Sequence, residues 1–170
     1  MGRVVGAESS PERQTASQMK IRDATSRDLK RIVEIERLAF DHPWSIDSFL
    51  RELTLPFSRT IVATTASDEE LTGYLIRWLV ADECHILNVA VDPTRRRRGV
   101  ALRLMIDAIA EAKVKDAQLV TLEVRRSNLA ARGLYRKLDF QERRLRRNYY
   151  GRGEDAIVME LVLGTGVLSK

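Results

Sequence analysis

The sequence predicts one α/β domain with a mixed central β-sheet and helices on both faces. The chain has 170 residues and is 44% hydrophobic, which is enough to build a single core. Its periodic segments follow one another in the order βααβββαβαββ, without an internal repeat. The alternation of strand and helix in the second half implies parallel crossover connections, whereas the consecutive strands of the first half suggest antiparallel pairing.

The ordered domain is expected over residues 19–163. Residues 1–18 mix Gly, Ser, Gln and Glu without a continuous apolar core, so they indicate a disordered leader rather than a secretory signal. Residues 164–170 are expected to form a flexible tail. No stretch approaches the roughly 20 apolar residues of a transmembrane helix, and we therefore expect no membrane partner.

The first half is expected to contain two short helices between strands. Residues 19–25 alternate apolar and polar side chains, which predicts the first strand. Helical apolar spacing then begins after Thr25 or Ser26, either of which suits an N-cap, and includes Leu29, Ile32, Val33, Ile35, Leu38 and Ala39. Pro43 disfavours helical geometry before it, and Ser45 is expected to cap a second helix that extends through Leu53.

The remaining segments complete the sheet. Strands are predicted over residues 60–65, 71–80, 84–91 and 119–124, because β-formers are concentrated there. The apolar pattern predicts helices over residues 98–115 and 128–138. Residues 141–148 and 156–163 are expected to form a closing pair of strands.

Charge and cysteine content narrow the possible environments. The 29 Lys and Arg exceed the 24 Asp and Glu, and the net charge of +5 favours anionic partners such as phosphate groups or RNA surfaces. Because Cys84 is the only cysteine, no disulfide can form within the chain, which fits a reducing compartment such as the cytoplasm. We expect Cys84 to be a small buried strand residue, with a nucleophilic thiol as the alternative. His42 and His85 lack metal-ligand spacing, so no metal is expected.

The most informative segment joins the strand that ends at Val91 to the helix that follows Gly99. The first N–H groups of a helix have no partner within it, and the helix dipole adds partial positive charge there. Such a terminus binds phosphate well. The four arginines from Arg95 to Arg98 add charge, and Gly99 permits close approach of the backbone. The same arginines could instead be a solvated charge run or a nucleic-acid patch.

This segment resembles the pyrophosphate loop of the GNAT acetyltransferases. Arg96, Gly99 and Ala101 occupy the three fixed places of the family's pattern. Four later segments continue the resemblance, namely residues 122–128, 134–140, 147–150 and 154–156. The ordered set is similar to the ribosomal-protein alanine N-acetyltransferases and to archaeal N-terminal acetyltransferases, and it extends over about residues 19–163. The resemblance implies the GNAT fold.

The resemblance also implies acetyl-CoA as co-substrate and assigns its contacts. The backbone of three strand residues would pair with the pantetheine arm, namely Val89, Ala90 and Val91. The pyrophosphate would lie in a cradle made by Arg96, Arg97, Arg98, Gly99, Val100, Ala101 and Leu102. Asn128 would contact the cofactor arm.

Glu123 matches the family's general base. An amine must lose its proton before it attacks a thioester, and a carboxylate can accept that proton directly or through water. Glu123 alternates with Leu122 and Val124 in a mostly apolar strand, which should raise its pKa. The alternative is a strand-end glutamate paired with Arg125 or Arg126.

Tyr135 matches the family's general acid. It follows Glu123 by 12 residues, across one strand-to-helix turn, so both side chains can face one cleft. A phenol with a pKa of about 10 can protonate the departing CoA thiolate. The alternative is a core tyrosine beside Leu134 and Leu138. Gly133, inside the same predicted helix, costs about 1 kcal/mol relative to Ala and is expected to loosen the support of Tyr135.

The substrate is expected to be a protein N-terminus, with ribosomal proteins among the candidates. By resemblance, five residues would line or flank the peptide slot, namely Glu36, Phe40, Trp44, Tyr149 and Tyr150. Ordinary packing of these aromatics is the alternative. Acetylation of a lysine or of a small amine, and a non-enzymatic role in binding RNA or the ribosome, remain open. No nucleic-acid motif is present, and a monomer or weak homodimer is expected.

Overall fold

The computed structural model describes residues 19–164 and contains one seven-stranded mixed sheet in the order β1-β2-β3-β4-β5-β7-β6. Its strands are β1 (Lys20–Asp23), β2 (Ser58–Thr64), β3 (Leu71–Val80), β4 (Glu83–Val91), β5 (Leu119–Arg125), β6 (Gln141–Arg146) and β7 (Ala156–Val162). Only the β4–β5 pair is parallel, and the other neighbours are antiparallel. The predicted mixed sheet is therefore confirmed.

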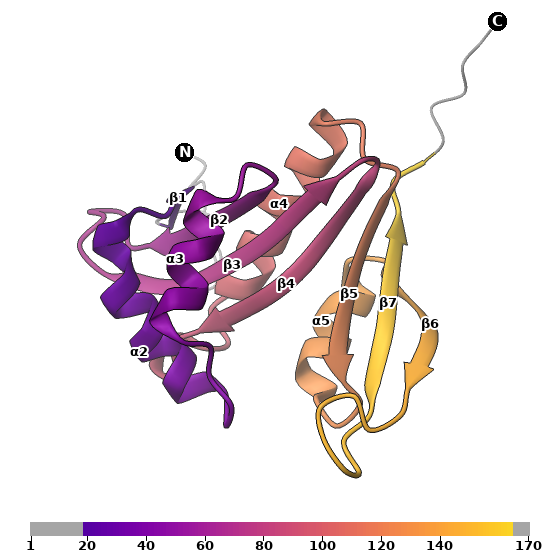
Figure 1. Cartoon of the computed structure of the whole chain (residues 1–170). Coiled ribbons are helices and arrows are strands. Elements are labelled where there is room, and N and C mark those ends of the chain that lie inside the picture. Colours follow the sequence, from indigo (N-terminus) through magenta and orange to yellow (C-terminus); the bar gives the residue numbers. More distant parts are fainter. Residues whose placement is uncertain (1–18, 165–170) are drawn as a thin grey trace, which may run out of the picture.

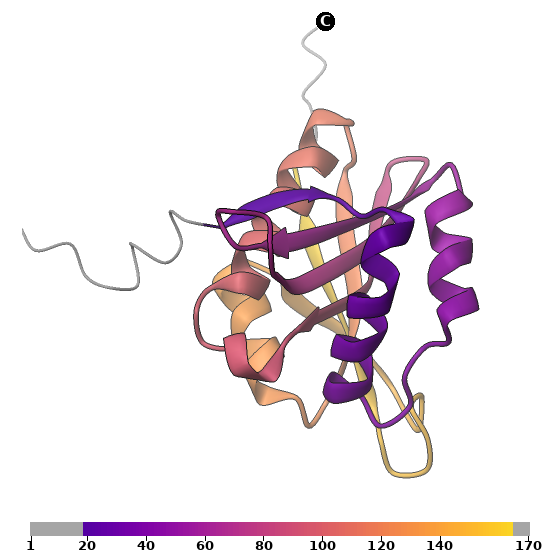
Figure 2. The same ribbon diagram turned by 90° about the vertical axis from the view of Figure 1, so that its left-hand side faces the viewer.

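Helices cover both faces of this sheet, as Figures 1 and 2 show. Helices α2 and α3 pack on one face of β2, β3 and β4, while α4 lies across the other face. The helical elements are the 3₁₀ turn η1 (Ser26–Asp28), α2 (Leu29–Ala39), α3 (Ile46–Thr54), the 3₁₀ turn η2 (Pro93–Arg95), α4 (Val100–Val114) and α5 (Leu129–Lys137). The helices fall where the apolar spacing predicts them.

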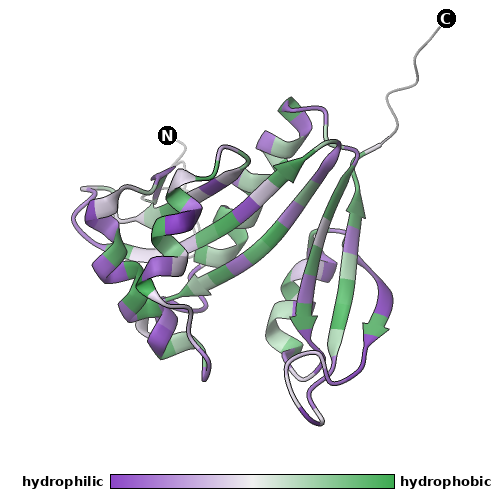
Figure 3. Ribbon diagram, in the orientation of Figure 1, coloured by the Kyte–Doolittle hydropathy of each residue, from purple (hydrophilic) through white to green (hydrophobic). Residues whose placement is uncertain are grey.

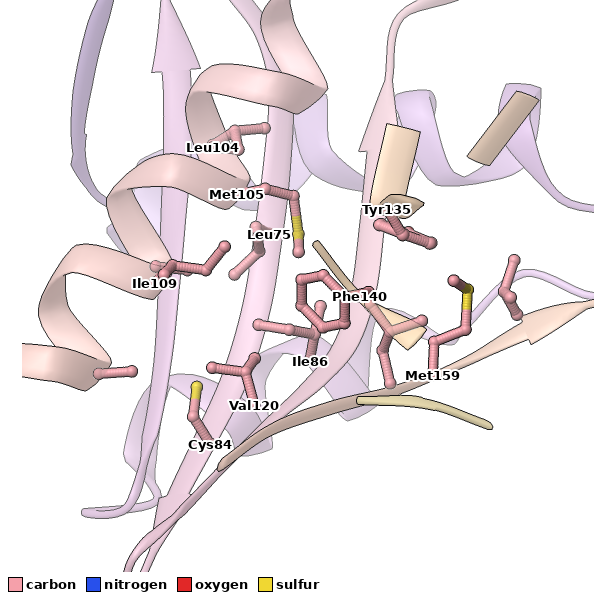
Figure 4. Close-up of a cluster of buried hydrophobic side chains, with 14 of the residues drawn as sticks. Leu75, Cys84, Ile86, Leu104, Met105, Ile109, Val120, Tyr135, Phe140 and Met159 are labelled. Carbon is pink, nitrogen blue, oxygen red and sulfur yellow. The ribbon is translucent and has the colours of Figure 1, made fainter. Parts of the chain in front are cut away.

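Two hydrophobic clusters, one on each face, hold these layers together, and the apolar residues concentrate along the strands in Figure 3. The larger cluster joins α4 and α5 to the sheet and includes Met105, Val120 and Met159 (Figure 4). The smaller one joins α2 and α3 to β2, β3 and β4. Burial of apolar surface on both faces fixes the order of the layers.

Strands β4 and β5 separate halfway along their length. Their parallel pairing ends at Ile86 and Leu122, and the two strands diverge toward their carboxyl ends (Figure 1). Strand β4 also carries an irregularity at this level, because Ile86 lies opposite Arg77 while Asn88 lies opposite Ile76. Leu87 is therefore the extra residue of a bulge, and bulges bend a strand away from its neighbour. The divergence opens the centre of the sheet.

Two details differ from the sequence predictions. The first helix begins with the 3₁₀ turn η1, and Thr25 and Asp28 form the reciprocal capping box before it. Leu38, which was expected on the apolar face, is 61% exposed, although Glu36 before it and Ala39 after it pack inward. The predicted leader over residues 1–18 and residues 165–170 of the predicted tail lie outside the described residues.

Candidate active site

The free edge of β4 lies next to the basic turn. On the β5 side, residues 87–91 have no strand partner within the described chain, while Val89, Ala90 and Val91 stay paired to β3 on the other side. Backbone N–H and C=O groups along such an edge can pair with an extended ligand. This matches the expected position of the pantetheine arm.

The turn after β4 is anchored at its start. The buried carboxylate of Asp92 accepts hydrogen bonds from the Thr94 hydroxyl (2.7 Å) and backbone N–H (2.8 Å), and it also binds the guanidinium of Arg31 on α2. The hydrogen bond from the Thr94 hydroxyl has the largest effect on the pKa of Asp92 and lowers it. Burial opposes this shift, whereas the Thr94 backbone N–H and Arg31 add to it. Asp92 therefore anchors the start of the turn. The sequence patterns did not identify this anchor, although an Asp directly after a strand is a signal for it.

Two glycines set the start of α4. Gly99 is the N-cap with φ +78°, a left-handed conformation that costs other residues free energy. A Cβ on Gly73 would lie 2.9 Å from the carbonyl oxygen of Ala90 and from Cγ1 of Val100, so only glycine lets the helix start pack this closely on β3. The N–H groups of Val100, Ala101 and Leu102 belong to the first turn and have no acceptor within the helix.

The four arginines of the turn are not equivalent. Arg95 is half-buried and forms an ion pair with Glu70, which leaves it less available to a ligand. Arg96, Arg97 and Arg98 are exposed immediately before the helix, and Arg97 adopts φ +62°. Free N–H groups, the helix dipole and three exposed guanidinium groups meet at this point. The arrangement suits a pyrophosphate.

Asn128 is the N-cap of α5, and its side-chain oxygen accepts a hydrogen bond from the N–H of Ala131 at 3.0 Å. The cap fixes the amide at the start of the helix that carries Tyr135. A contact between Asn128 and the cofactor stays a prediction.

Glu123 is the first residue of β5 beyond the end of its pairing with β4. It lies on the expected face of the strand, because Val120, Leu122 and Val124 are buried in the larger core cluster on the other face. Its surroundings are not apolar, however. Oε1 of Glu123 lies 2.7 Å from the guanidinium of Arg146, a residue of the edge strand β6.

The arginines expected as alternative partners of Glu123 are engaged elsewhere. Arg125 lies 3.6 Å from Glu154, and Arg126 lies 3.6 Å from Asp155. Sequence reasoning missed the partner that the structure supplies, Arg146. The register of β5, β7 and β6 would have been needed to find it, since the two residues are 23 positions apart.

Tyr135 is buried in the larger core cluster with its ring 5.9 Å from that of Phe140 (Figure 4). Burial, and after it the neighbouring Tyr150, raises the pKa of Tyr135 to about 12. Burial and the charge of Glu123 raise the pKa of Tyr150 to about 12 as well. Tyr150 is thus the electrostatic neighbour of both proposed catalytic residues. Tyr135 keeps its proton at neutral pH, as a general acid must.

Tyr149 and Tyr150 lie in the loop between β6 and β7, with rings 5.1 Å apart and nearly perpendicular. Tyr149 is 48% exposed, whereas Tyr150 is half-buried. A hydrogen bond to the Glu123 carboxylate raises the pKa of the Tyr149 phenol, and burial adds to this shift. Both tyrosines therefore lie at Glu123, where a substrate that reaches this carboxylate would meet them.

Glu36 does not face an entrance. It is 1% exposed, and its carboxylate accepts hydrogen bonds from the N–H of Trp44 at 2.9 Å, from Asn88 at 3.2 Å and from the Tyr74 hydroxyl. Burial and the charge of Glu36 raise the pKa of Tyr74. Glu36 thus ties the loop after α2 to β3 and to the diverging part of β4. Direct contact with substrate does not fit this burial.

Phe40 and Trp44 lie at either end of that loop, partly exposed and packed against the smaller core cluster. Trp44 contacts Phe49 with ring centroids 5.7 Å apart. Both residues therefore pack as ordinary aromatics, while part of each surface remains open. Their contact with a peptide stays a prediction.

Cys84 is fully buried, and burial raises the pKa of its thiol to about 11. The alternative of a nucleophilic Cys84 is therefore wrong, because the thiolate is the reactive form. No helix within residues 19–164 is both long and apolar enough to cross a membrane.

Comparison with known proteins gives consistent matches. The model of the acetyltransferase (GNAT) family matches residues 29–140. The [ribosomal protein bS18]-alanine N-acetyltransferase of Escherichia coli K12 is 38% identical over 141 residues, which cover 79% of this chain and 90% of that protein. The Salmonella typhimurium enzyme of the same name is 36% identical over 140 residues, 81% and 93% of the two chains. The crystal structure of the E. coli ribosomal-protein-S18-alanine N-acetyltransferase superposes with a TM-score of 0.81 at 32% identity and covers 89% of this chain and 98% of that one.

Proposed function

Because the chain belongs to the acetyltransferase (GNAT) family, whose co-substrate is acetyl-CoA, we propose that it acetylates the α-amino group of a protein N-terminus. A ribosomal protein is the first candidate, because the enzymes that resemble the chain over most of their length are named for the alanine N-terminus of bS18. Such a reaction suits the cytoplasm and needs no partner subunit, and we expect a monomer or a weak homodimer.

One observation carries the proposal. The pairing of β4 and β5 ends at Ile86 and Leu122, so the free edge of β4 and the residue Glu123 both lie just beyond the point where the two strands separate. The edge of β4 continues directly into the arginine turn and the start of α4. A cofactor extended along β4 with its pyrophosphate at α4 would bring its thioester toward Glu123.

Glu123 and Tyr135 would supply the proton transfers that the reaction needs. An α-amine has a reference pKa near 8 and is largely protonated at neutral pH. Glu123 would accept this proton, directly or through water, and the free amine would attack the thioester carbonyl carbon. When the tetrahedral intermediate collapses, the carbon–sulfur bond breaks and the CoA thiolate leaves. Tyr135, kept protonated by its raised pKa, would donate a proton to the thiolate.

The proposal that the enzyme acetylates an α-amine, rather than a lysine, can be tested directly. One peptide would begin with a free alanine and contain no lysine, and its matched control would have a blocked N-terminus and one internal lysine. Mass spectrometry after incubation with acetyl-CoA would locate the added acetyl group. Acetylation of the first peptide alone is expected, and acetylation of only the lysine peptide or of a small polyamine would refute the proposal.

A companion measurement addresses the RNA-binding alternative. Binding of single-stranded RNA would be titrated at several salt concentrations, together with calorimetric titration of acetyl-CoA. We expect saturable acetyl-CoA binding. Salt-sensitive RNA affinity without acetyl-CoA binding would favour a ribosome- or RNA-binding module instead.

A further inference from the structure

Arg146 contacts the carboxylate of Glu123 from an edge strand two strands away. Across β7, Glu123 lies opposite Val158 and Arg146 lies opposite Ala156, so the two side chains are diagonal neighbours on one face of the sheet. The guanidinium reaches Oε1 at 2.7 Å. No helix of the described chain packs on this face of β5, β7 and β6 (Figure 1), because α5 lies behind it. The contact therefore forms on an open face.

Arg146 also organises the aromatic residues beside this carboxylate. Its guanidinium lies over the ring of Tyr149, 5.2 Å from the centroid, and Glu123 raises the pKa of the same tyrosine. The guanidinium of Arg125 likewise lies over the ring of Tyr150, 4.6 Å from its centroid. Arg146 thus links the β6–β7 loop to the carboxylate through a charge and a cation–π contact.

We propose that Arg146 is the positioning residue of the catalytic base, holding the carboxylate of Glu123 in one orientation. This inference rests on the proposed role of Glu123. A glutamate side chain has several rotatable bonds, and its motion must be restricted for efficient proton transfer. The ion pair with Arg146 and the neighbouring phenol of Tyr149 restrict it from two sides.

The pair contributes little to folding, which separates this role from a structural one. The side chains of Arg146 and Glu123 are 39% and 26% exposed, and ion pairs with this exposure are worth little for stability. Loss of Arg146 should therefore leave thermal unfolding nearly unchanged, while the orientation of the carboxylate changes.

The charged and titratable groups on the same face as Glu123 are Arg146 of β6, the phenols of Tyr149 and Tyr150, Arg125 of β5, and Arg144 of β6, which lies across β7 from Glu123. Arg125 is paired with Glu154, so Arg146 is the cation in direct contact among the described residues. Loss of Arg146 would therefore leave the carboxylate without a directly contacting cation among the described residues, and its orientation would no longer be fixed.

The test is a double-mutant cycle with Arg146→Ala and Glu123→Gln, measured with acetyl-CoA and the alanine-initiated peptide. Arg146→Ala alone should lower kcat/KM by about tenfold or more. In the Glu123→Gln background it should cause almost no further loss, because both substitutions remove the same function. Arg146→Lys, which keeps the charge but not the planar fork, should restore part of the rate.

Arg144→Ala is the matched control. Arg144 lies on the same strand and the same face, opposite Val158, is exposed, and forms no ion pair with the described residues. The Arg144→Ala variant should keep wild-type kinetics and stability. Equal losses from Arg146→Ala in both backgrounds, or wild-type rates in Arg146→Ala, would overturn the inference. If only the lysine peptide is acetylated, the proposed substrate is wrong, and the same cycle run with that peptide still decides the role of Arg146.

Discussion

Replacement of Gly99 by glutamate separates cofactor binding from folding. Gly99 has φ +78°, but a Cβ placed on it would meet no atom within 4 Å. The substitution therefore costs only backbone strain, about 1 kcal/mol, which corresponds to a decrease in Tm of roughly 2–4 °C for a domain of this size. Gly99→Glu should remain folded.

The added carboxylate should act mainly on the ligand. At an effective dielectric constant of about 20, two unit charges about 6 Å apart repel by roughly 3 kcal/mol. This repulsion corresponds to about 10²-fold weaker binding of acetyl-CoA, and a pyrophosphate that brings more than one charge would increase the loss. Gly99→Ala carries the same strain without the charge and should bind more tightly than Gly99→Glu.

Isothermal titration calorimetry with acetyl-CoA measures these affinities, and thermal unfolding checks the fold. Gly164→Glu is a suitable control, since Gly164 also has a positive φ of +98° and open space around its Cβ but lies beyond the last strand. An unchanged Kd in folded Gly99→Glu, or an equal loss in Gly164→Glu, would refute the assignment of the turn to the pyrophosphate.

Three further substitutions test the catalytic acid and the packing around the site. Tyr135→Phe should lower kcat by about 10²-fold with little change in the Kd for acetyl-CoA, and near-normal turnover would make Tyr135 a core residue only. Glu111→Gln should cost about 3 kcal/mol of unfolding free energy, read by denaturant titration, because it removes the ionic partner of the buried Arg77; an unchanged unfolding midpoint would contradict this. Gly133→Ala should stabilise α5 by about 1 kcal/mol, since its Cβ would meet no atom within 4 Å, and a lower Tm would contradict that reasoning.

Glu111 also gives stability a defined dependence on pH. Burial alone would raise its pKa, but hydrogen bonds from Arg77 and Arg59 outweigh burial and lower the pKa of Glu111 below its usual 4.5. A lowered pKa in the folded state means that the stabilisation is present above pH 4.5 and is lost as the pH falls through the folded value. Unfolding midpoints measured from pH 7 to pH 3 should therefore decrease less steeply in Glu111→Gln than in the wild type.

Most of the fold was predictable because its signals are local. Strand β3 has the predicted bounds, residues 71–80, and Ser45 caps α3 by accepting a hydrogen bond from the N–H of Ser48. Alternation of side chains placed Glu123 on the correct face of β5. Each of these inferences needs only neighbours within a few positions along the chain.

The contacts that the site residues make with residues of other strands could not be predicted from such local signals. The partner of Glu123 depends on the register of three strands, and the burial of Glu36 depends on Tyr74 and Asn88, which come from two other strands. A carboxylate in an apolar pattern carries no sign of which distant donor reaches it. For that reason the sequence pointed to Glu123 but assigned it the wrong neighbours, and it placed Glu36 at an entrance although Glu36 is buried.

The pH dependence of kcat/KM for Glu123→Gln tests the central claim, that this carboxylate is the general base. The amide keeps the shape of the side chain but cannot accept the proton of the substrate amine. The rate should fall by about 10²-fold or more near neutral pH and recover partly as the pH rises, because the amine then loses its proton unaided. Thermal unfolding controls for stability. A variant with the wild-type rate and the wild-type pH profile would contradict the account.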